Sequence, residues 1–263
     1  MPSVQVNGIQ VYYKIYGEGE PLLFIHGLGS SGRDWETQVN YFSSRYQVIV
    51  FDVRGHGSTA KPPGPYSVPL FAKDCAEMMK SLDVEQTHVV GISMGAMVGL
   101  QMAIDYPELV KSLVVINTGP DLVVRTLKDI FLLWQRLLIV RLLGMRKMGE
   151  VLSKRLFPKP EQTDLRNIFI ERWAENDPRA YRNTLKGLVG WSVVKNMPEI
   201  NCPTLIVAAD QDYTPLESKM VLVEQIPGAK LAVIEDSHHA APMEKPEEFN
   251  RILDEFLNSV PQS

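Results

Sequence analysis

The chain has 263 residues, of which 45% are hydrophobic and 22% are charged. These fractions are ordinary for a globular protein and exclude a long disordered chain. The formal net charge of -4 argues against a nucleic-acid partner. The length allows one substantial core, and α/β folds of this size are commonly a single domain with an insertion.

The cysteines and the apolar segments indicate where in the cell the protein is expected. Cys75 and Cys202 are expected to be buried free thiols rather than a disulfide or a metal pair. Residues 1–11 lack the basic stretch and apolar core of a secretory signal, so a cytoplasmic location is expected. The most apolar stretch, residues 130–140, is interrupted by Arg136 and is shorter than the roughly 20 residues that span a bilayer.

The chain begins with a predicted β-hairpin. Residues 4–6 and 9–16 flank Asn7-Gly8, and Asn-Gly supplies the positive backbone angles that such a turn needs. Short continuous apolar runs then recur along the chain, which is typical of buried parallel strands. These runs are residues 22–25, 48–51, 89–92, 113–116, 205–208 and 231–234.

Helical patterns separate these runs, at residues 67–82, 94–105, 216–225 and 247–257. Strands that alternate with helices predict a mostly parallel, twisted sheet flanked by helices. The alternation stops between residues 119 and 198. We therefore expect a core made of residues 1–119 and 199–263, with a helical lid at 120–198 inserted after the sixth core strand.

The expected lid is rich in large apolar residues. Some of them recur at helical spacing, namely Leu127, Ile130, Phe131, Trp134, Leu137 and Leu138. Three of the four tryptophans, Trp134, Trp173 and Trp191, also lie in this segment. They are candidates for the apolar wall of a substrate pocket, and the alternative is that they pack the lid on itself.

The pentapeptide Gly91-Ile92-Ser93-Met94-Gly95 lies between a β-branched apolar run and a helical pattern. A sharp turn from strand to helix strains the backbone at its central residue, and only small flanking residues let the chain pack that closely. The pattern predicts that Ser93 projects its hydroxyl from the end of the sheet. Ser93 is therefore a candidate nucleophile.

A nucleophilic serine needs a histidine base and a carboxylate that orients it, in the chain order serine, acid, histidine. The acidic loop after residues 204–208 offers Asp210 and Asp212. The run at 230–234 is followed shortly by His238 and His239. All of these residues follow the carboxyl ends of predicted strands, where open α/β sheets place their ligands. The residue pattern leaves both choices open.

With these landmarks the chain resembles the α/β-hydrolase superfamily. Further matches are His26-Gly27-Leu28-Gly29, the run from Asp52 to Ser58, and His239 followed by Glu244 and Pro246. The resemblance implies an α/β-hydrolase fold with a catalytic triad and no cofactor or metal.

The resemblance also implies which of the two aspartates and which of the two histidines is catalytic. The family usually has Gly-x-x-Asp after this strand, which selects Asp212 although Ala209 replaces the glycine. The family spacing to Glu244 selects His239, while His238 stands where glycine is usual. The amides of Leu28 and Met94 match the family's oxyanion-hole donors.

One competing motif overlaps these residues. The run from Gly27 to Gly32 satisfies the dinucleotide-binding fingerprint, follows a predicted strand and has Asp52 about 20 residues further on. This alternative is a nicotinamide-dependent dehydrogenase. It leaves the ordered set Ser93, Asp212 and His239 unexplained.

The expected activity is hydrolysis of a small carboxylic ester or lactone by an acyl-enzyme route. Within the superfamily, Ser93–Gly99, Asn117-Thr118 and Arg141–Met145 look most similar to the 3-oxoadipate enol-lactonase and carboxylesterase groups, with Ala96 as a departure. The same triad serves carbon–carbon bond hydrolases of ring-cleavage products and cofactor-free haloperoxidases or perhydrolases. The sequence does not choose between a monomer and a homodimer.

Overall fold

The structure is a computed structural model, in which residues 2–261 are described. One eight-stranded sheet has the strand order β1-β2-β4-β3-β5-β6-β7-β8. Strands β1 and β2 are antiparallel to their neighbours, and the other neighbouring pairs run parallel. The strands are β1 Ser3–Val6, β2 Ile9–Tyr16, β3 Glu20–Ile25, β4 Tyr46–Phe51, β5 Thr87–Ile92, β6 Val110–Ile116, β7 Thr204–Ala209 and β8 Lys230–Ile234.

The predicted hairpin and parallel strands are confirmed. Asn7 and Gly8 have φ angles of 43° and 75°, the left-handed values that a tight hairpin turn needs. The six apolar runs correspond to β3 to β8, each within the observed strand bounds.

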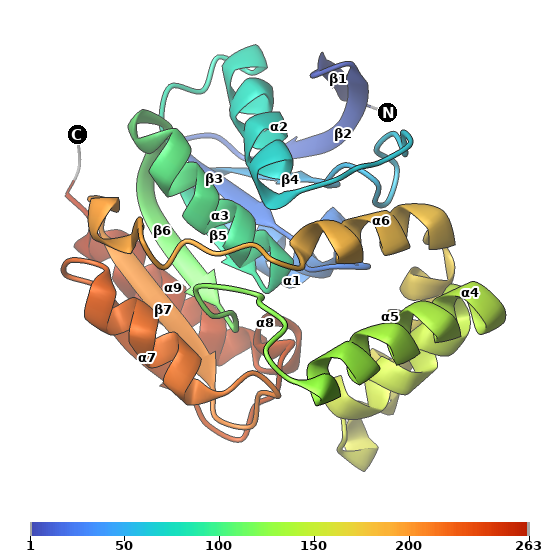
Figure 1. Ribbon diagram of the computed structural model, residues 1–263. Helices are drawn as coiled ribbons and strands as arrows, with labels where there is room; N and C mark the ends of the chain where they lie inside the picture. The colour runs from blue at the N-terminus through green and yellow to red at the C-terminus, as the bar shows by residue number, and fades with distance from the viewer. Residues whose placement is uncertain (1, 262–263) are drawn as a thin grey trace.

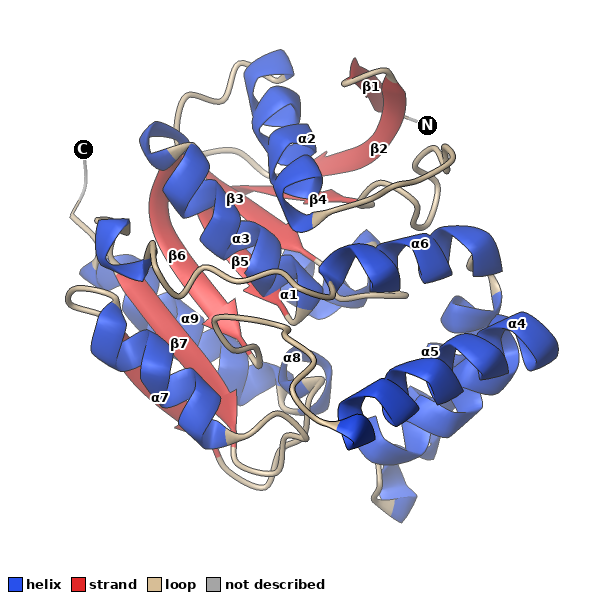
Figure 2. Ribbon diagram, in the orientation of Figure 1, coloured by secondary structure: helices blue, strands red, loops and turns tan. Residues whose placement is uncertain are grey.

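Helices cover both faces of the sheet (Figures 1 and 2). The helices of this core are α1 Glu36–Phe42, α2 Val68–Ser81, α3 Met94–Asp105, α7 Leu216–Gln225, α8 Ala241–Glu244 and α9 Pro246–Ser259. Alternate residues of β3 divide between the faces: Leu23 and Ile25 pack in the core beneath α2 and α3, whereas Leu22 and Phe24 pack beneath α1 and α9. The helical pattern did not predict the short α1 and α8.

Three helices lie between β6 and β7, where a helical insertion was expected. They are α4 Leu127–Leu156, α5 Thr163–Ala174 and α6 Pro178–Leu188. In Figure 1, α4 and α5 lie side by side, and α6 lies on the side nearer α2 and α3. Gly144 has a φ of 78° and breaks α4 into two helical parts.

Part of the apolar stripe predicted in this insertion points outward. Leu127 is 84% exposed, and Ile130, Phe131 and Trp134 are each more than half exposed. Leu137 of the same stripe is partly buried and packs toward α5 and α6, as do its neighbours Leu133, Ile139 and Val140. The helix is apolar on more than one side, so periodicity alone did not separate its buried side from its exposed side. Within residues 2–261, none of the helices combines the length and apolar character that crossing a bilayer requires.

Candidate active site

Ser93 occupies the turn between β5 and α3 in a strained conformation, with φ 55° and ψ -115°. Its amide donates to the carbonyl of Ile116 at the end of the neighbouring strand, at 2.9 Å. A Cβ atom on Gly95 would lie 2.1 Å from the Ile25 carbonyl oxygen, and one on Gly91 would lie 2.3 Å from the Gly95 carbonyl oxygen. Close packing of strand and helix therefore requires glycine on both sides of Ser93.

Ser93 lines a cavity of about 760 Å³, between the carboxyl end of the sheet and the inserted helices. Leu28, Met94 and His239 line the same cavity, together with side chains of α4 and α5. The size of the cavity suits a small-molecule ligand.

His239 and Asp212 form a hydrogen-bonded pair at the edge of this cavity. The Nδ1 atom of His239 lies 2.7 Å from Oδ1 of Asp212. The ring of Tyr213 stacks on the imidazole, with 4.2 Å between the ring centroids. Because the carboxylate engages Nδ1, the Nε2 atom of His239 is left to exchange a proton with a nucleophile.

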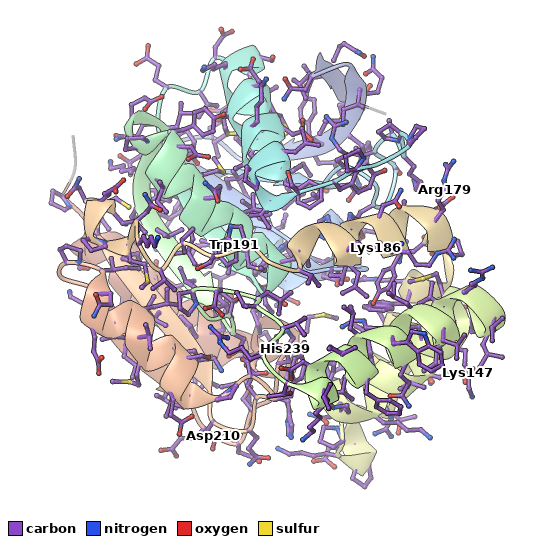
Figure 3. The ribbon with its side chains drawn as sticks, in the orientation of Figure 1. Lys147, Arg179, Lys186, Trp191, Asp210 and His239 are labelled. Atoms are coloured by element: carbon purple, nitrogen blue, oxygen red, sulfur yellow. The ribbon has the colours of Figure 1, made fainter. Side chains whose placement is uncertain are left out.

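The neighbouring candidates have other partners. His238 binds Glu244 twice, through Nδ1 at 2.9 Å and through its amide at 2.5 Å. The carboxylate of Asp210 is exposed and accepts from the Ser237 amide at 3.1 Å. Figure 3 shows His239 near the middle of the molecule and Asp210 on the outer loops. The geometry therefore favours Asp212 and His239 as the acid and the base.

The second oxygen of Asp212 has two further partners that the sequence did not point to. Oδ2 accepts from Nζ of Lys219 at 2.7 Å and from the hydroxyl of Thr214. Burial by itself would raise the pKa of Asp212, but hydrogen bonds from His239, Lys219 and Thr214 outweigh burial and lower this pKa to about 2. Asp212 is therefore a carboxylate throughout the physiological range.

The loop after β3 places Leu28 beside Ser93. A Cβ atom on Gly27 would lie 3.7 Å from Cβ of Ser93, so the two backbones are close. Met94 is the first residue of α3, and its amide has no partner within the helix. The two amides expected to form an oxyanion hole thus belong to residues that line one cavity with Ser93.

His26 holds this loop in place from below. Its Nδ1 lies 2.8 Å from the carbonyl oxygen of Gly27, and its Nε2 lies 2.9 Å from the amide nitrogen of Val53. The ring is fully buried, and this burial lowers the pKa of His26 to about 4 despite the bond to Gly27. His26 is therefore a neutral ring that holds the loop in place.

Asp52 has a similar bracing position, which removes the basis of the dinucleotide alternative. Its Oδ1 accepts from the Gly32 amide at 2.9 Å, and its Oδ2 accepts from the Ser58 amide at 2.7 Å. Both oxygens therefore hold loops together, whereas a dinucleotide site needs this carboxylate for the ribose.

Asn117 connects three parts of the site, a role that the sequence analysis missed. It follows β6 with a φ of 48°. Its Nδ2 donates to the carbonyl of His239 at 2.9 Å, and its Oδ1 accepts from the amide of Ala209 at 2.9 Å. A polar residue directly after a buried strand was the available signal. Asn117 fixes the histidine loop relative to the end of β7, which precedes the loop of Asp212.

The three tryptophans proposed as pocket walls have different positions. Trp173 lines the cavity and lies against Gly29, where a Cβ atom would come within 2.6 Å of its ring. Trp134 is 58% exposed on the outer side of α4 and lies outside the cavity lining. Trp191 is buried and donates through Nε1 to Gln101 of α3 at 2.9 Å, so it anchors the insertion to the core (Figure 3). Only Trp173 fits the expectation of a pocket wall.

Two arginines of α4 add positive charge to the cavity. Arg136 donates through Nε to the hydroxyl of Tyr181, and Arg155 lies 5.1 Å from the centre of the Tyr213 ring. The acidic residues of the lining already have partners: Asp34 pairs with Arg172, Asp121 pairs with Arg125, and Asp129 caps α4. The cavity therefore offers cationic groups to a ligand.

The charged groups do not suggest a metal centre. Among residues 2–261, no three His, Cys, Asp or Glu side chains are grouped so that they could hold a metal ion.

Comparison with known proteins identifies the same architecture. A family model described as alpha/beta hydrolase fold matches residues 20–246. The chain is 28% identical to a protein of Azorhizobium caulinodans assigned as the carbamate hydrolase RutD, over the full length of both chains. It is also 28% identical to 3-oxoadipate enol-lactonase 2 of Acinetobacter baylyi, covering 97% of this chain and 96% of that protein. The enol-lactonase structure from Burkholderia xenovorans LB400 superposes with a TM-score of 0.92 at 22% identity, covering 98% of this chain and 100% of that chain.

Proposed function

The chain belongs to the α/β-hydrolase fold family and is a hydrolase, and from this premise we propose that it cleaves a small carboxylic ester or lactone through an acyl-enzyme on Ser93. The observation that carries the proposal is the 2.7 Å bond between His239 and Asp212, at the edge of the cavity that Ser93 lines. The chain order of serine, acid and histidine, Ser93, Asp212 and His239, is the order that this fold uses, which supports the proposal.

The proposed reaction has two halves. Oγ of Ser93 attacks the substrate carbonyl while Nε2 of His239 takes the hydroxyl proton, and the amides of Leu28 and Met94 donate to the resulting oxyanion. Collapse of this intermediate releases the alcohol, which receives the proton from His239. A water molecule, deprotonated by the same imidazole, then attacks the acyl group and frees Ser93. Asp212 remains ionised and stabilises the imidazolium that forms in each half.

In this proposal the inserted residues 120–198 form a lid over the cavity. Trp173 of α5 packs on Gly29, so the insertion contacts the loop that carries an oxyanion donor. Residues of α4 and α5 form one wall of the cavity, and such walls select substrates without changing the chemistry.

The arginines of the cavity favour a substrate whose acyl part bears a carboxylate. Arg136 and Arg155 have no carboxylate partner among the described side chains, although both line the cavity. Guanidinium groups bind carboxylates through paired, charge-assisted hydrogen bonds. Carbamates, the substrate class assigned to one similar protein, present the same kind of carbonyl to Ser93 and belong in the test.

A covalent probe tests the nucleophile. A fluorophosphonate should label Ser93 at one-to-one stoichiometry, and Ser93→Ala should lower turnover at least about a thousandfold, as loss of a triad member usually does. Folding of the variant should be checked by circular dichroism. Labelling of a different serine, with hydrolysis retained in Ser93→Ala, would contradict the proposal.

A substrate panel tests the bond and the acyl group. The panel contains matched neutral and carboxylate-bearing esters, enol-lactones, N-substituted carbamates and ring-cleavage diketones. We expect the carboxylate-bearing esters or lactones to have the highest kcat/KM, and Arg136→Leu should lower that value about tenfold through KM while the neutral esters change little. Preference for the diketones would support the carbon–carbon bond hydrolase alternative instead.

A further inference from the structure

Lys219 is a buried cation directly behind the proposed catalytic acid. It is the fourth residue of α7 and is 0% exposed. Its ammonium group donates to Oδ2 of Asp212 at 2.7 Å and to the carbonyl oxygen of Thr214 at 2.8 Å. Burial of an ammonium ion is costly even when it is paired, and an apolar side chain of similar volume often serves stability as well or better. Stability of the fold therefore gives little reason for a lysine at this position.

The two oxygens of Asp212 have separate partners. Oδ1 faces His239, whereas Oδ2 faces Lys219 and Thr214. A carboxylate held at both oxygens cannot rotate away from the imidazole. The ammonium charge also lies on the far side of the same carboxylate, where it opposes the arrival of a second positive charge on His239.

We infer that Lys219 is a positioning residue that holds the Asp212 carboxylate and sets the acidity at which His239 stops acting as a base. The inference rests on the proposed function, because it assigns His239 as the base.

Other charged or titratable groups also surround His239 and must be held constant. They come from the acid loop, the histidine loop and the inserted helices, and they are Tyr213, His238, Glu244, Arg136 and Arg155. None of them contacts the Asp212 carboxylate, whereas Lys219 bonds to it directly. A change at Lys219 is therefore the most direct way to alter the charge behind the acid.

The test compares the pH dependence of kcat/KM in Lys219→Met, Lys219→Gln and Lys219→Arg. The acid limb of this profile reports the base of the free enzyme. Loss of the charge in the Met and Gln variants should move the acid limb upward by roughly one pH unit, so that kcat/KM at pH 5 relative to pH 8 falls about tenfold below the wild-type ratio. Lys219→Arg keeps the charge and should keep the wild-type limb. Lys230→Met, at an exposed position at the start of β8, is the matched control.

The outcomes separate a role in charge from a role in folding. If the Met and Gln variants lose activity equally at every pH, or if Lys230→Met shifts the limb as much, the inference is wrong. If the wild-type protein shows no Ser93-dependent hydrolysis, the proposed function fails. Lys219 can then still be tested by NMR titration of the ¹⁵N-labelled imidazole of His239, whose midpoint should rise in the Met variant and stay in the Arg variant. If Lys219→Met does not fold, the Gln variant provides the same comparison.

Discussion

His239 and its neighbour His238 differ in what their Nδ1 atoms contact. The first faces Asp212 at the cavity, and the second faces Glu244 at the end of α8. Glu244 also accepts from the backbone amide of His238, so it fixes the conformation of the loop that presents the next residue. A carboxylate at this spacing therefore shapes the loop rather than orienting the base.

The two histidines and the two aspartates should respond differently to substitution. His239→Ala and Asp212→Asn should each lower kcat at least about a thousandfold, because one removes the proposed base and the other its proposed orienting partner. His238→Ala and Asp210→Asn should retain activity within about tenfold. Steady-state kinetics on the best ester, with melting temperatures to verify folding, would check this, and a reversed pattern would move the assignment to the other pair.

At the residue scale, the order of a strand-end serine, an acid loop and a histidine loop predicted where Ser93, Asp212 and His239 lie. The choice of Asp212 over Asp210 and of His239 over His238 came from the family resemblance, and the catalytic roles of all three stay a proposal. Lys219 was not predictable, because a lysine on an amphipathic helix normally faces solvent and only the fold brings it behind Asp212.

The turn between β5 and α3 leaves little space for side chains. The helix begins so close to β3 that a methyl group on Gly95 would overlap the carbonyl oxygen of Ile25, which is backbone and cannot rotate away. One turn later, a Cβ on Gly99 would be 3.0 Å from Cδ1 of Leu113, the end of a flexible side chain. The two glycines of one helix therefore differ in what they tolerate.

This difference can be measured in the melting temperature. Gly95→Ala should destabilise the protein by about 3 kcal/mol through overpacking and lower the melting temperature by at least about 6 °C. Gly99→Ala should change it by no more than about 2 °C, because the gain in helix propensity offsets a small rearrangement of Leu113. Equal effects from both substitutions, measured by differential scanning calorimetry, would contradict this account of the turn.

Element-scale prediction succeeded for the core and was weaker in the insertion. Strands β3 to β7 were evident because they are largely buried on both faces and therefore continuously apolar. The edge strand β8 is partly exposed but keeps an apolar run. In α4, the helix period was visible, but of the predicted stripe Leu137 packs in the cluster with α5 and α6, together with Leu133, Ile139 and Val140 outside the stripe. Which side of an all-round apolar helix is buried depends on partners that its own sequence does not specify.

At the scale of the whole molecule, two buried histidines link stability to pH. The rings of His26 and His56 are 5.1 Å apart, and both are almost fully buried. Burial lowers the pKa of His56 to about 3, helped by the nearby His26, and burial lowers that of His26 to about 4. The amide of Val53 donates a hydrogen bond to Nε2 of His26. Protonation of Nε2 would place a second N–H donor opposite this amide, which would break the hydrogen bond.

The lowered pKa values of His26 and His56 make the folded protein less stable at acid pH. The unfolded chain takes up protons near pH 6.5 and the folded protein does so only near pH 4 and below, so stability is full above pH 6.5 and falls as the pH drops through that window. We expect His26 to account for a loss of about 3 kcal/mol between pH 6.5 and pH 4. Urea unfolding at a series of pH values would measure it. A flat free energy of unfolding over this range would show that the histidines titrate as in the unfolded chain.

The carboxylate of Asp212 affects the stability of the fold in a lower pH range than the histidines do. The lowered pKa of Asp212 stabilises the folded state above about pH 4, and this contribution is lost only as the pH falls toward 2. Loss of stability between pH 6.5 and 4 can therefore be assigned to buried histidine rather than to the proposed catalytic acid.

The unequal burial of the four tryptophans makes the chain suitable for fluorescence spectroscopy. Trp134 is largely exposed, whereas Trp35, Trp173 and Trp191 are each less than a tenth exposed, and Trp35 and Trp173 border the cavity. Iodide should quench the emission of Trp134 first, and Trp134→Phe should leave a blue-shifted spectrum from the interior. In that variant, emission would report ligand entry directly, without a chromogenic substrate or an added dye.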